Sequence, residues 1–232
     1  MRWKDYWNTF PKQFKNNEFF KQVAKTVSGQ PISEEHFQGI ISDIVEKLEL
    51  SSDDFVLDLC CGNGLITSKI AERCRAIIGV DYSKPLIKVA QEHHTRVNTR
   101  YINLSVLDIS ADNLFVSQPF SKIFMYEALQ YFEEEQFPVL LKKLLTLSAE
   151  DIIILFASVP DRSKIWEFYN TPERKRDYYV RSQSGTEAIG TWWSKSLIYR
   201  ICDDYDLECE YLPQQKQFHT SHYRFDVRIR RQ

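Results

Sequence analysis

The residues best suited to chemistry lie at the ends of two short apolar runs. Residues 56–64 contain the first run, in which Asp58 is followed by Gly62 and Gly64 and then by an amphipathic segment. Glycines in a tight turn let backbone N–H groups approach a ligand closely, and the N-terminus of the next helix favours electron-rich groups. The second run ends in Asp81, 19 residues after Gly62. That spacing is typical of a carboxylate that binds a ribose diol, so the two stretches predict a nucleotide site in a doubly wound α/β fold.

The glycine spacing also distinguishes between two kinds of nucleotide. A dinucleotide-binding turn needs a third glycine three residues after the second, and this chain has Thr67 there. Asp58 would repel a pyrophosphate, whereas it suits a ligand that carries an ammonium group and no phosphate. The turn therefore disfavours a nicotinamide-dependent oxidoreductase, which stays as an alternative interpretation.

In these features the chain resembles the class I S-adenosylmethionine-dependent methyltransferases, whose first motif reads E/D-x-G-x-G-x-G. Cys60 takes the place of the first glycine, where that family tolerates small residues. The resemblance runs in order through residues 33–229 and includes further strands at 101–104, 121–126, 151–156 and 222–229. It implies S-adenosylmethionine as the cofactor and a doubly wound, mostly parallel seven-stranded sheet with helices on both faces.

The resemblance also assigns roles to residues that follow the strands. Asp108 would bind the adenine amino group, and Leu107 and Ile109 would enclose the purine ring. The predicted cofactor-binding residues are Asp58, Cys60, Gly62, Asn63, Gly64, Asp81, Tyr82, Leu107, Asp108, Ile109 and Tyr126, with Gln22 and Thr26 from the N-terminal segment.

Several of these residues have a purely structural interpretation as well. Asp58 could cap the turn through its side chain, and Asp81 could simply precede a helix that begins near Ser83. Asp108 could be a solvated turn residue, and Tyr126 could pack in the core. The sequence leaves these alternatives open.

Residues 1–32 are dense in aromatic side chains. Those at helical spacing are Trp3, Tyr6, Trp7 and Phe10. This pattern predicts an amphipathic helix that docks on the core, and the family resemblance implies that it closes over the methionine end of the cofactor. Gln22 and Thr26 are four residues apart, which would place both on one helix face within reach of the cofactor carboxylate.

The chain is expected to form one domain with four parts. These are a helical cap at 1–32, a cofactor-binding α/β core at 33–159, a lid insertion at 160–194, and a C-terminal helix and strand pair at 195–232. The lid combines aromatic residues with arginines and lysines, which suits a polar, ring-bearing or anionic substrate. It could equally be a helical cap packed by its own aromatic side chains.

Methyl transfer from a sulfonium requires in-line alignment of the acceptor and exclusion of water. A hydroxyl acceptor would also need a base, for which His219, His222 and Glu127 are candidates. Histidine is preferred because its ordinary pKa lies near neutrality. An amine or an anionic oxygen would need no base, and the sequence does not choose between these cases.

Composition favours an ordinary α/β enzyme of 232 residues, with 43% hydrophobic and 27% charged residues. The five cysteines form no C-x-x-C pair, which predicts reduced thiols in a cytoplasmic setting, and no metal-ligand spacing is present. A net charge of −2, with scattered basic residues, disfavours a nucleic-acid partner, and no signal or membrane segment is expected. The oligomeric state is not predicted.

The expected activity is methylation of an oxygen or nitrogen in a small polar metabolite or saccharide-type intermediate. The substrate class rests on the resemblance alone. An RNA or protein methyltransferase, or a non-catalytic binding module, are the alternatives.

Overall fold

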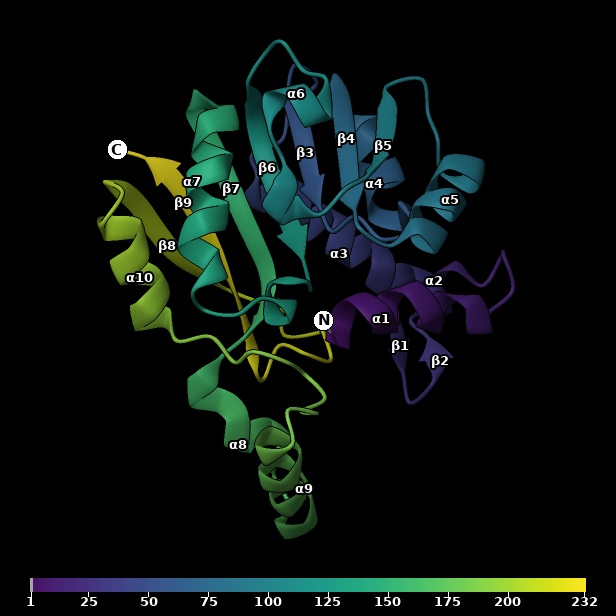
Figure 1. Ribbon diagram of the computed structural model, residues 1–232, viewed down its shortest axis with the longest axis vertical. Coiled ribbons are helices and arrows are strands. Elements are labelled where there is room, and N and C mark those ends of the chain that lie inside the picture. The colour runs from purple at the N-terminus through teal and green to yellow at the C-terminus, as the bar shows by residue number, and fades with distance from the viewer. Residues whose placement is uncertain (1) are drawn as a thin grey trace.

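A seven-stranded sheet forms the centre of the computed structural model, which describes residues 2–232 (Figure 1). The strand order is β5-β4-β3-β6-β7-β9-β8. The strands are β3 (Phe55–Leu59), β4 (Ala76–Asp81), β5 (Thr99–Asn103), β6 (Phe120–Tyr126), β7 (Ser148–Pro160), β8 (Leu207–Pro213) and β9 (Arg224–Arg231). Strands β3 to β7 run parallel, and β9 is antiparallel to both β7 and β8. The predicted fold class, a doubly wound and mostly parallel seven-stranded sheet, is confirmed.

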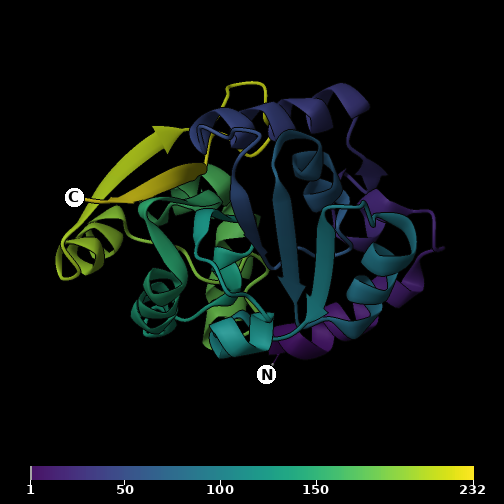
Figure 2. The same ribbon diagram turned by 90° about the horizontal axis from the view of Figure 1, so that it is seen from above.

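Helices cover both faces of the sheet (Figure 2). They include α3 (Glu34–Lys47), α4 (Leu65–Ile70), α5 (Lys84–His93), α6 (Ala111–Leu114), α7 (Gln136–Leu147) and α10 (Lys195–Asp203). Because successive side chains of a strand point to opposite faces, Val56 packs in the cluster beneath α3 while Leu57 packs in the cluster beneath α7. Both faces are therefore apolar, which explains why β3 is buried along its whole length.

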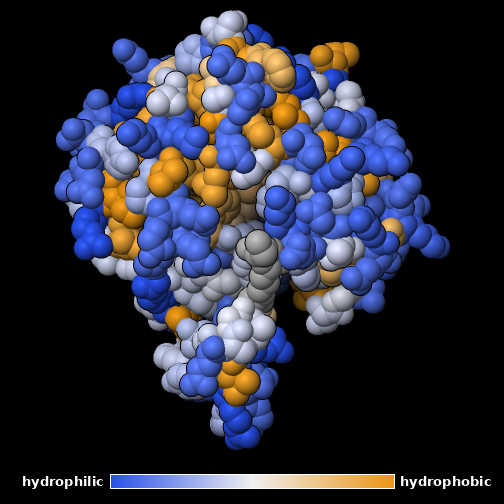
Figure 3. All heavy atoms as spheres, in the orientation of Figure 1, coloured by the Kyte–Doolittle hydropathy of each residue, from blue (hydrophilic) through white to orange (hydrophobic). Residues whose placement is uncertain are grey.

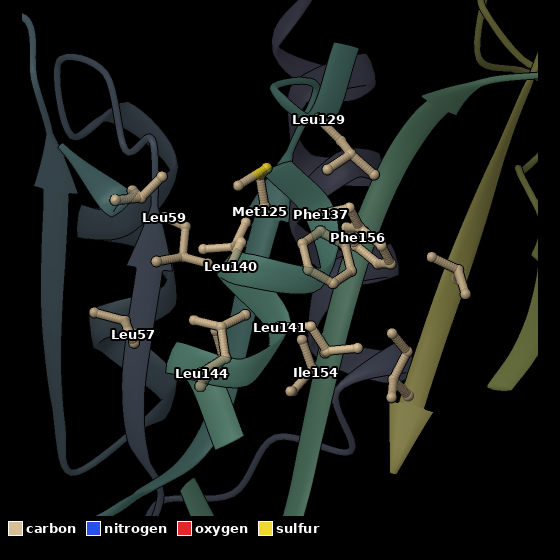
Figure 4. Packing of buried hydrophobic residues seen from close by; sticks show 14 of the residues in the cluster. Leu57, Leu59, Met125, Leu129, Phe137, Leu140, Leu141, Leu144, Ile154 and Phe156 are labelled. Atoms are coloured by element: carbon tan, nitrogen blue, oxygen red, sulfur yellow. The ribbon is translucent and has the colours of Figure 1, made fainter. Parts of the chain in front are cut away.

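The core beneath α7 is built from leucines of the helix and side chains of the strands of the sheet (Figure 4). Leu140, Leu141 and Leu144 are fully buried, and they lie over Leu57 of β3 and Ile154 of β7. The helical spacing of these leucines puts them on one face, so α7 buries a continuous apolar stripe. This packing holds the strands in register and fixes where their carboxyl ends lie.

The N-terminal cap consists of α1 (Arg2–Thr9), a 3₁₀ turn η1 (Phe10–Gln13), α2 (Phe19–Gln22) and a hairpin of β1 (Thr26–Val27) and β2 (Gln30–Pro31). The predicted aromatic stripe docks on the core, with the ring centroids of Trp3 and Tyr131 4.7 Å apart. The expectation that Gln22 and Thr26 share a helix face is wrong. The chain reverses at Ala24, whose φ is +53°, and Thr26 enters the hairpin instead.

The lid carries the turn η5 (Arg162–Lys164), α8 (Ile165–Phe168) and α9 (Pro172–Gln183). These helices project from the main body as a narrow extension whose visible face is mostly hydrophilic (Figures 1 and 3). A small aromatic cluster of Tyr169, Trp192 and Tyr223 packs at the base of the lid. Across residues 2–232, no helix is long and apolar enough to span a bilayer.

Trp193 anchors the end of the lid in the main core. Its side chain is fully buried, its indole N–H donates a hydrogen bond to the Leu129 carbonyl (3.1 Å), and its ring lies 5.5 Å from that of Phe137. The neighbouring Trp192 instead packs in the aromatic cluster of the lid. Of the two adjacent tryptophans, Trp193 therefore packs in the main body and Trp192 packs in the lid, and together they connect the two parts.

We expect Trp193→Ala to lower the free energy of unfolding by about 3–5 kcal/mol, because it removes a large buried side chain and leaves a cavity. Urea unfolding followed by circular dichroism measures this loss. Trp166→Ala is the matched control, since Trp166 is 43% exposed on the lid, and its effect should be well under half as large. Equal losses in the two variants would contradict this view of the lid anchor.

Candidate functional site

The carboxyl ends of the central parallel strands open into a cavity of about 980 Å³. Its walls come from the turn after β3, the segments after β4, β5 and β6, the N-terminal cap, the lid and the loop before β9. This volume lies at the upper end of the range for small-molecule sites, and ligands of open α/β sheets bind at this edge. The cavity can therefore hold two small molecules end to end.

Eleven of the sequence-predicted residues line this cavity. They are Thr26, Cys60, Gly62, Asn63, Asp81, Tyr82, Leu107, Asp108, Tyr126, Glu127 and His219. Five predicted residues do not line it, namely Gln22, Asp58, Gly64, Ile109 and His222. The structure thus brings together most of the set from segments spread over almost the whole chain.

The turn after β3 depends on left-handed backbone conformations. Cys60, Gly62 and Gly64 have φ values of +59°, +57° and +77°. A Cβ at Gly64 would lie 2.6 Å from the Tyr101 hydroxyl oxygen, so this position requires glycine on two grounds. Cys60 adopts the conformation in which a glycine is favoured, which explains physically why the motif it departs from has glycine there. The turn aims the backbone of Gly62 and Asn63 into the cavity.

Asp81 joins this turn to the end of β4. One carboxylate oxygen accepts a hydrogen bond from the Gly62 N–H (3.0 Å), and the other accepts one from the Ser83 N–H (2.7 Å). Burial raises the pKa of Asp81 to about 6, although the two N–H groups oppose the shift. Because the carboxylate also lines the cavity, it can accept hydrogen bonds from a ligand diol.

Asp58 and Gln22 lie behind the cavity wall. Asp58 is 3% exposed and accepts a hydrogen bond from the Thr67 hydroxyl of α4 (2.6 Å), and burial raises its pKa to about 8. Gln22 accepts a hydrogen bond from the Asn63 side chain (3.0 Å) and donates one to the Lys15 carbonyl (2.9 Å). In this structure both residues therefore support the turn instead of facing the ligand space.

The end of β6 carries a second group of polar residues. Glu127, with φ of +52°, forms an ion pair with Lys25 and accepts a hydrogen bond from the Ser158 hydroxyl (3.2 Å). Burial on its own would raise the pKa of Glu127, but Lys25 and Arg224 outweigh that effect and lower the pKa to about 2. So low a pKa makes Glu127 a fixed negative charge and a poor proton acceptor near neutrality.

The two histidine candidates lie in different places. His219 lines the cavity, and burial lowers its pKa despite the opposing charge of Glu127. The imidazole is therefore neutral at pH 7 and can accept a proton. His222 lies in a separate, shallower groove with Lys195 and Tyr211, so it cannot act on a ligand in the main cavity. Of the three predicted bases, His219 alone combines position with a suitable protonation state.

Four cations line the cavity, and they are Lys4, Lys25, Arg181 and Arg224. The sequence predicts a basic lid, which includes Arg181, but it does not mark the other three as residues of the site. Lys25 lies in the segment between α2 and β1, with its ammonium 4.0 Å from the centroid of the Tyr126 ring. Arg181 comes from the last turn of α9, and Arg224 is the first residue of β9. No local motif marks them, because loops and strand ends bring them together only in the folded chain.

Among residues 2–232, no group of three or more His, Cys, Asp or Glu side chains is arranged to hold a metal ion. The polar groups of the cavity instead suit an organic ligand. Its lining includes carboxylates at the end of β4 and after β5, several aromatic rings, and cations from the N-terminal cap, the lid and β9.

Comparison with known proteins agrees with this fold and cavity. Residues 56–150 match the family model described as a methyltransferase domain. An uncharacterized methyltransferase of Schizosaccharomyces pombe is 34% identical over 89 residues, which is 38% of this chain and 27% of that protein. A probable cobalt-precorrin-6B C(15)-methyltransferase of Methanocaldococcus jannaschii is 30% identical over 97 residues, 42% of this chain and 50% of that protein. The chain thus spans about a quarter to a half of the length of these curated relatives.

Solved structures extend the likeness to the whole chain. Magnesium protoporphyrin IX methyltransferase from Synechocystis, solved with S-adenosylhomocysteine, superposes with a TM-score of 0.66 at 12% identity and covers 100% of this chain and 98% of its own. The N-methyltransferase NodS from Bradyrhizobium japonicum has a TM-score of 0.60 at 15% identity, covering 86% and 98%. At such low identity these structures show the fold alone.

The fold is that of S-adenosylmethionine-dependent methyltransferases, and residues 56–150 match a methyltransferase domain. This match agrees with the predicted family and enzyme class, and the predicted cofactor, S-adenosylmethionine, or its demethylated product is bound in solved structures of the same fold. The contacts of individual residues with the cofactor stay predictions.

Protonation of Asp81 should control cofactor binding. If the ionised carboxylate accepts hydrogen bonds from the ribose diol, binding must expel the proton that Asp81 carries below about pH 6. We therefore expect the affinity for S-adenosylhomocysteine, measured by calorimetry, to fall about tenfold per pH unit below that value.

Asp81→Asn is the matched test of that proton linkage. The variant should bind S-adenosylhomocysteine more weakly at pH 7.5, by roughly 2–4 kcal/mol, and lose the pH dependence. Normal affinity in the variant would show that Asp81 only closes the turn and begins α5.

Proposed function

We propose that this chain transfers a methyl group from S-adenosylmethionine to an oxygen or nitrogen of a small polar molecule, either a metabolite or a saccharide-type intermediate. The observation that carries the proposal is that one cavity is lined both by the cofactor-type residues and by His219, Glu127 and Lys25. The N-terminal cap and the lid both contribute walls to it, so a bound acceptor would be shielded from water.

The residues at the donor end fit the adenosyl group. Asp81 offers a buried carboxylate for the ribose diol, and Leu107 offers an apolar surface for the adenine ring. Asp108 follows β5 and lines the same end, where it can accept a hydrogen bond from the adenine amino group. Bound there, the cofactor supplies an electrophilic methyl group, and the protein has to align an acceptor with it.

At the other end, the chain offers one proton acceptor and one fixed charge. His219 is neutral near pH 7 and can take the proton from a hydroxyl or ammonium acceptor. Glu127 stays ionised and holds Lys25 over the Tyr126 ring. This arrangement positions an acceptor between the loop before β9 and the end of β6.

The volume of the cavity, about 980 Å³, favours a small acceptor over a macromolecule. A ribosomal RNA (uracil-C5) methyltransferase of Haemophilus parainfluenzae is 31% identical over 85 residues, but the match covers only 19% of that protein. The match therefore concerns only a part of that protein. The net charge of −2 also disfavours a partner with a nucleic-acid backbone.

A thermal-shift assay tests the cofactor half of this proposal. S-adenosylmethionine and S-adenosylhomocysteine should each stabilise the protein by about 2.7 kcal/mol when present at a hundred times their Kd, because they bind the native state. NAD is the control and should leave the melting temperature unchanged. A shift with NAD and none with either adenosyl ligand would refute the proposal.

Substitution of the proposed base tests the other half, once a screen of methyl acceptors has found a substrate. His219→Gln should lower kcat by about 10²–10⁴-fold with unchanged cofactor affinity, and it should remove the rise of kcat/KM with pH that occurs below pH 6.5. His222→Gln, the matched control from the same loop, should behave as the wild type. An unchanged pH profile in His219→Gln would mean that the acceptor needs no base from this residue.

A further inference from the structure

Arg224 is a buried cation without a carboxylate partner. The residue is 8% exposed and lines the main cavity. One terminal nitrogen donates hydrogen bonds to the Gln130 side chain (2.8 Å) and to the Ser158 carbonyl, which are both neutral, and its Nε has no partner among the described residues. A buried charge without an ion-pair partner is unfavourable, so an anion that enters the cavity would be favoured there.

The carboxylates that the protein offers do not fill this role. Glu127 acts on Arg224 electrostatically, but its ion pair is with Lys25. Asp226 lies two residues along β9, and its ion pair is with Lys47. No carboxylate of residues 2–232 forms an ion pair with Arg224, although a guanidinium is the group best suited to bidentate pairing with an oxyanion.

The position of Arg224 separates it from the donor end. In the sheet, β9 lies three places from β3, through β6 and β7, which corresponds to roughly 14 Å at the usual spacing of strands. Arg224 pairs with Pro160 and so lies at the carboxyl end of β7. Most of the predicted cofactor residues lie at or after the ends of β3, β4 and β5, on the opposite side of β6, and Tyr126 lies at the end of β6 itself. This geometry places Arg224 beside the acceptor and away from the donor.

A second guanidinium reaches the same cavity from the lid. Arg181 lies in the last turn of α9, is exposed, and forms no ion pair with a carboxylate of the described residues. Aromatic rings line the same cavity, among them Tyr126 and Tyr131. The acceptor end thus presents two guanidinium groups beside flat apolar surfaces.

We propose that the methyl acceptor carries an oxyanion, a carboxylate or a phosphate, which binds between Arg224 and Arg181 on a ring-bearing or otherwise planar molecule. This inference rests on the proposed methyltransferase function and names the substrate class of that same cavity. With the anion held there, the remainder of the acceptor extends toward His219 and the methyl donor.

Four benzene derivatives of similar size test the proposal by calorimetry on protein saturated with S-adenosylhomocysteine at constant ionic strength. Benzoate and phenyl phosphate are the anionic probes, benzyl alcohol is the neutral probe, and benzylammonium is the cationic probe. At least one anion should bind ten times more tightly than the alcohol and the ammonium compound, and the stronger anion identifies the headgroup. Equal binding of all four would overturn the proposal.

Substitutions then place the anion. Arg224→Gln and Arg181→Gln should each weaken binding of the preferred anion at least tenfold, and Arg224→Lys should restore part of the loss. Arg176→Gln, an exposed residue of the same helix α9, is the matched control and should have no effect. If Arg224→Gln does not fold, Arg181→Gln carries the test, because its side chain is on the lid surface. Full anion affinity in Arg181→Gln would overturn the proposal.

Binding of S-adenosylhomocysteine itself distinguishes a failure of the proposed methyltransferase function from a failure of the anionic-acceptor proposal. If the wild type does not bind it, the proposed function fails, and the same anion titrations without it still test the arginine site. If the wild type binds it but Arg224→Gln binds it tenfold more weakly, Arg224 serves the carboxylate of the donor, and the acceptor proposal is wrong. Unchanged affinity for S-adenosylhomocysteine in both arginine variants is the expected result.

Discussion

The hydrogen bond from the Gly62 N–H to the Asp81 carboxylate is the contact on which the cofactor end of this protein depends. It ties a turn of left-handed residues to the end of the neighbouring strand, and it buries a carboxylate at the point where a ribose would lie. The next two residues extend the connection. Tyr82 donates a hydrogen bond to the Trp3 carbonyl (2.9 Å), and Ser83 donates one to the Trp7 carbonyl (2.6 Å). One short segment therefore fixes the turn, the carboxylate and the N-terminal helix together.

The acceptor end depends on a different buried carboxylate. Asp226 has no exposed surface, and its charge is balanced by Lys47. Its side chain accepts hydrogen bonds from the Ser158 N–H (2.6 Å) and from Gln214 (3.1 Å). Ser158 has a φ of +60°, where the pairing of β7 with β9 shifts register, and its hydroxyl donates to Glu127. Asp226 thus holds in place the strand segment that supports the charged groups of the site.

The same residue also reaches the loop before β9. Gln214 accepts a hydrogen bond from the Thr220 hydroxyl (3.1 Å), and Thr220 lies in the cavity wall beside His219. Both ends of the cavity therefore follow one physical rule. A buried carboxylate satisfies backbone N–H groups that strained turns leave without a partner, and the groups so positioned face the ligand space.

The donor end could be predicted from sequence because its chemistry is local. The turn, the 19-residue spacing to Asp81 and the apolar strands all depend on neighbours along the chain, and they lie in the structure where expected. The acceptor end could not be predicted in this way. His219 and His222 are three residues apart in a loop without periodicity, and only the fold shows that they face different cavities.

Two further differences between the sequence-based predictions and the structure also have physical causes. Helical spacing suggested that Gln22 and Thr26 act together, but the left-handed residue Ala24 ends that regularity before Thr26. Arg224 could not be recognised as functional from its place in an alternating strand. Arg224 stands out because its guanidinium is buried without an ion-pair partner. That burial depends on side chains distant in the sequence, including Gln130.

The central claim is that one cavity holds the donor over β3 and β4 and leaves the part lined by Arg224 and Arg181 free. A crystal structure with bound S-adenosylhomocysteine tests this claim most directly. We expect both ribose hydroxyls within hydrogen-bond distance of the Asp81 carboxylate, the sulfur directed toward the end of β6, and Arg224 and Arg181 facing unfilled space beyond it. An adenosyl group bound against Arg224, or outside the cavity, would contradict the account.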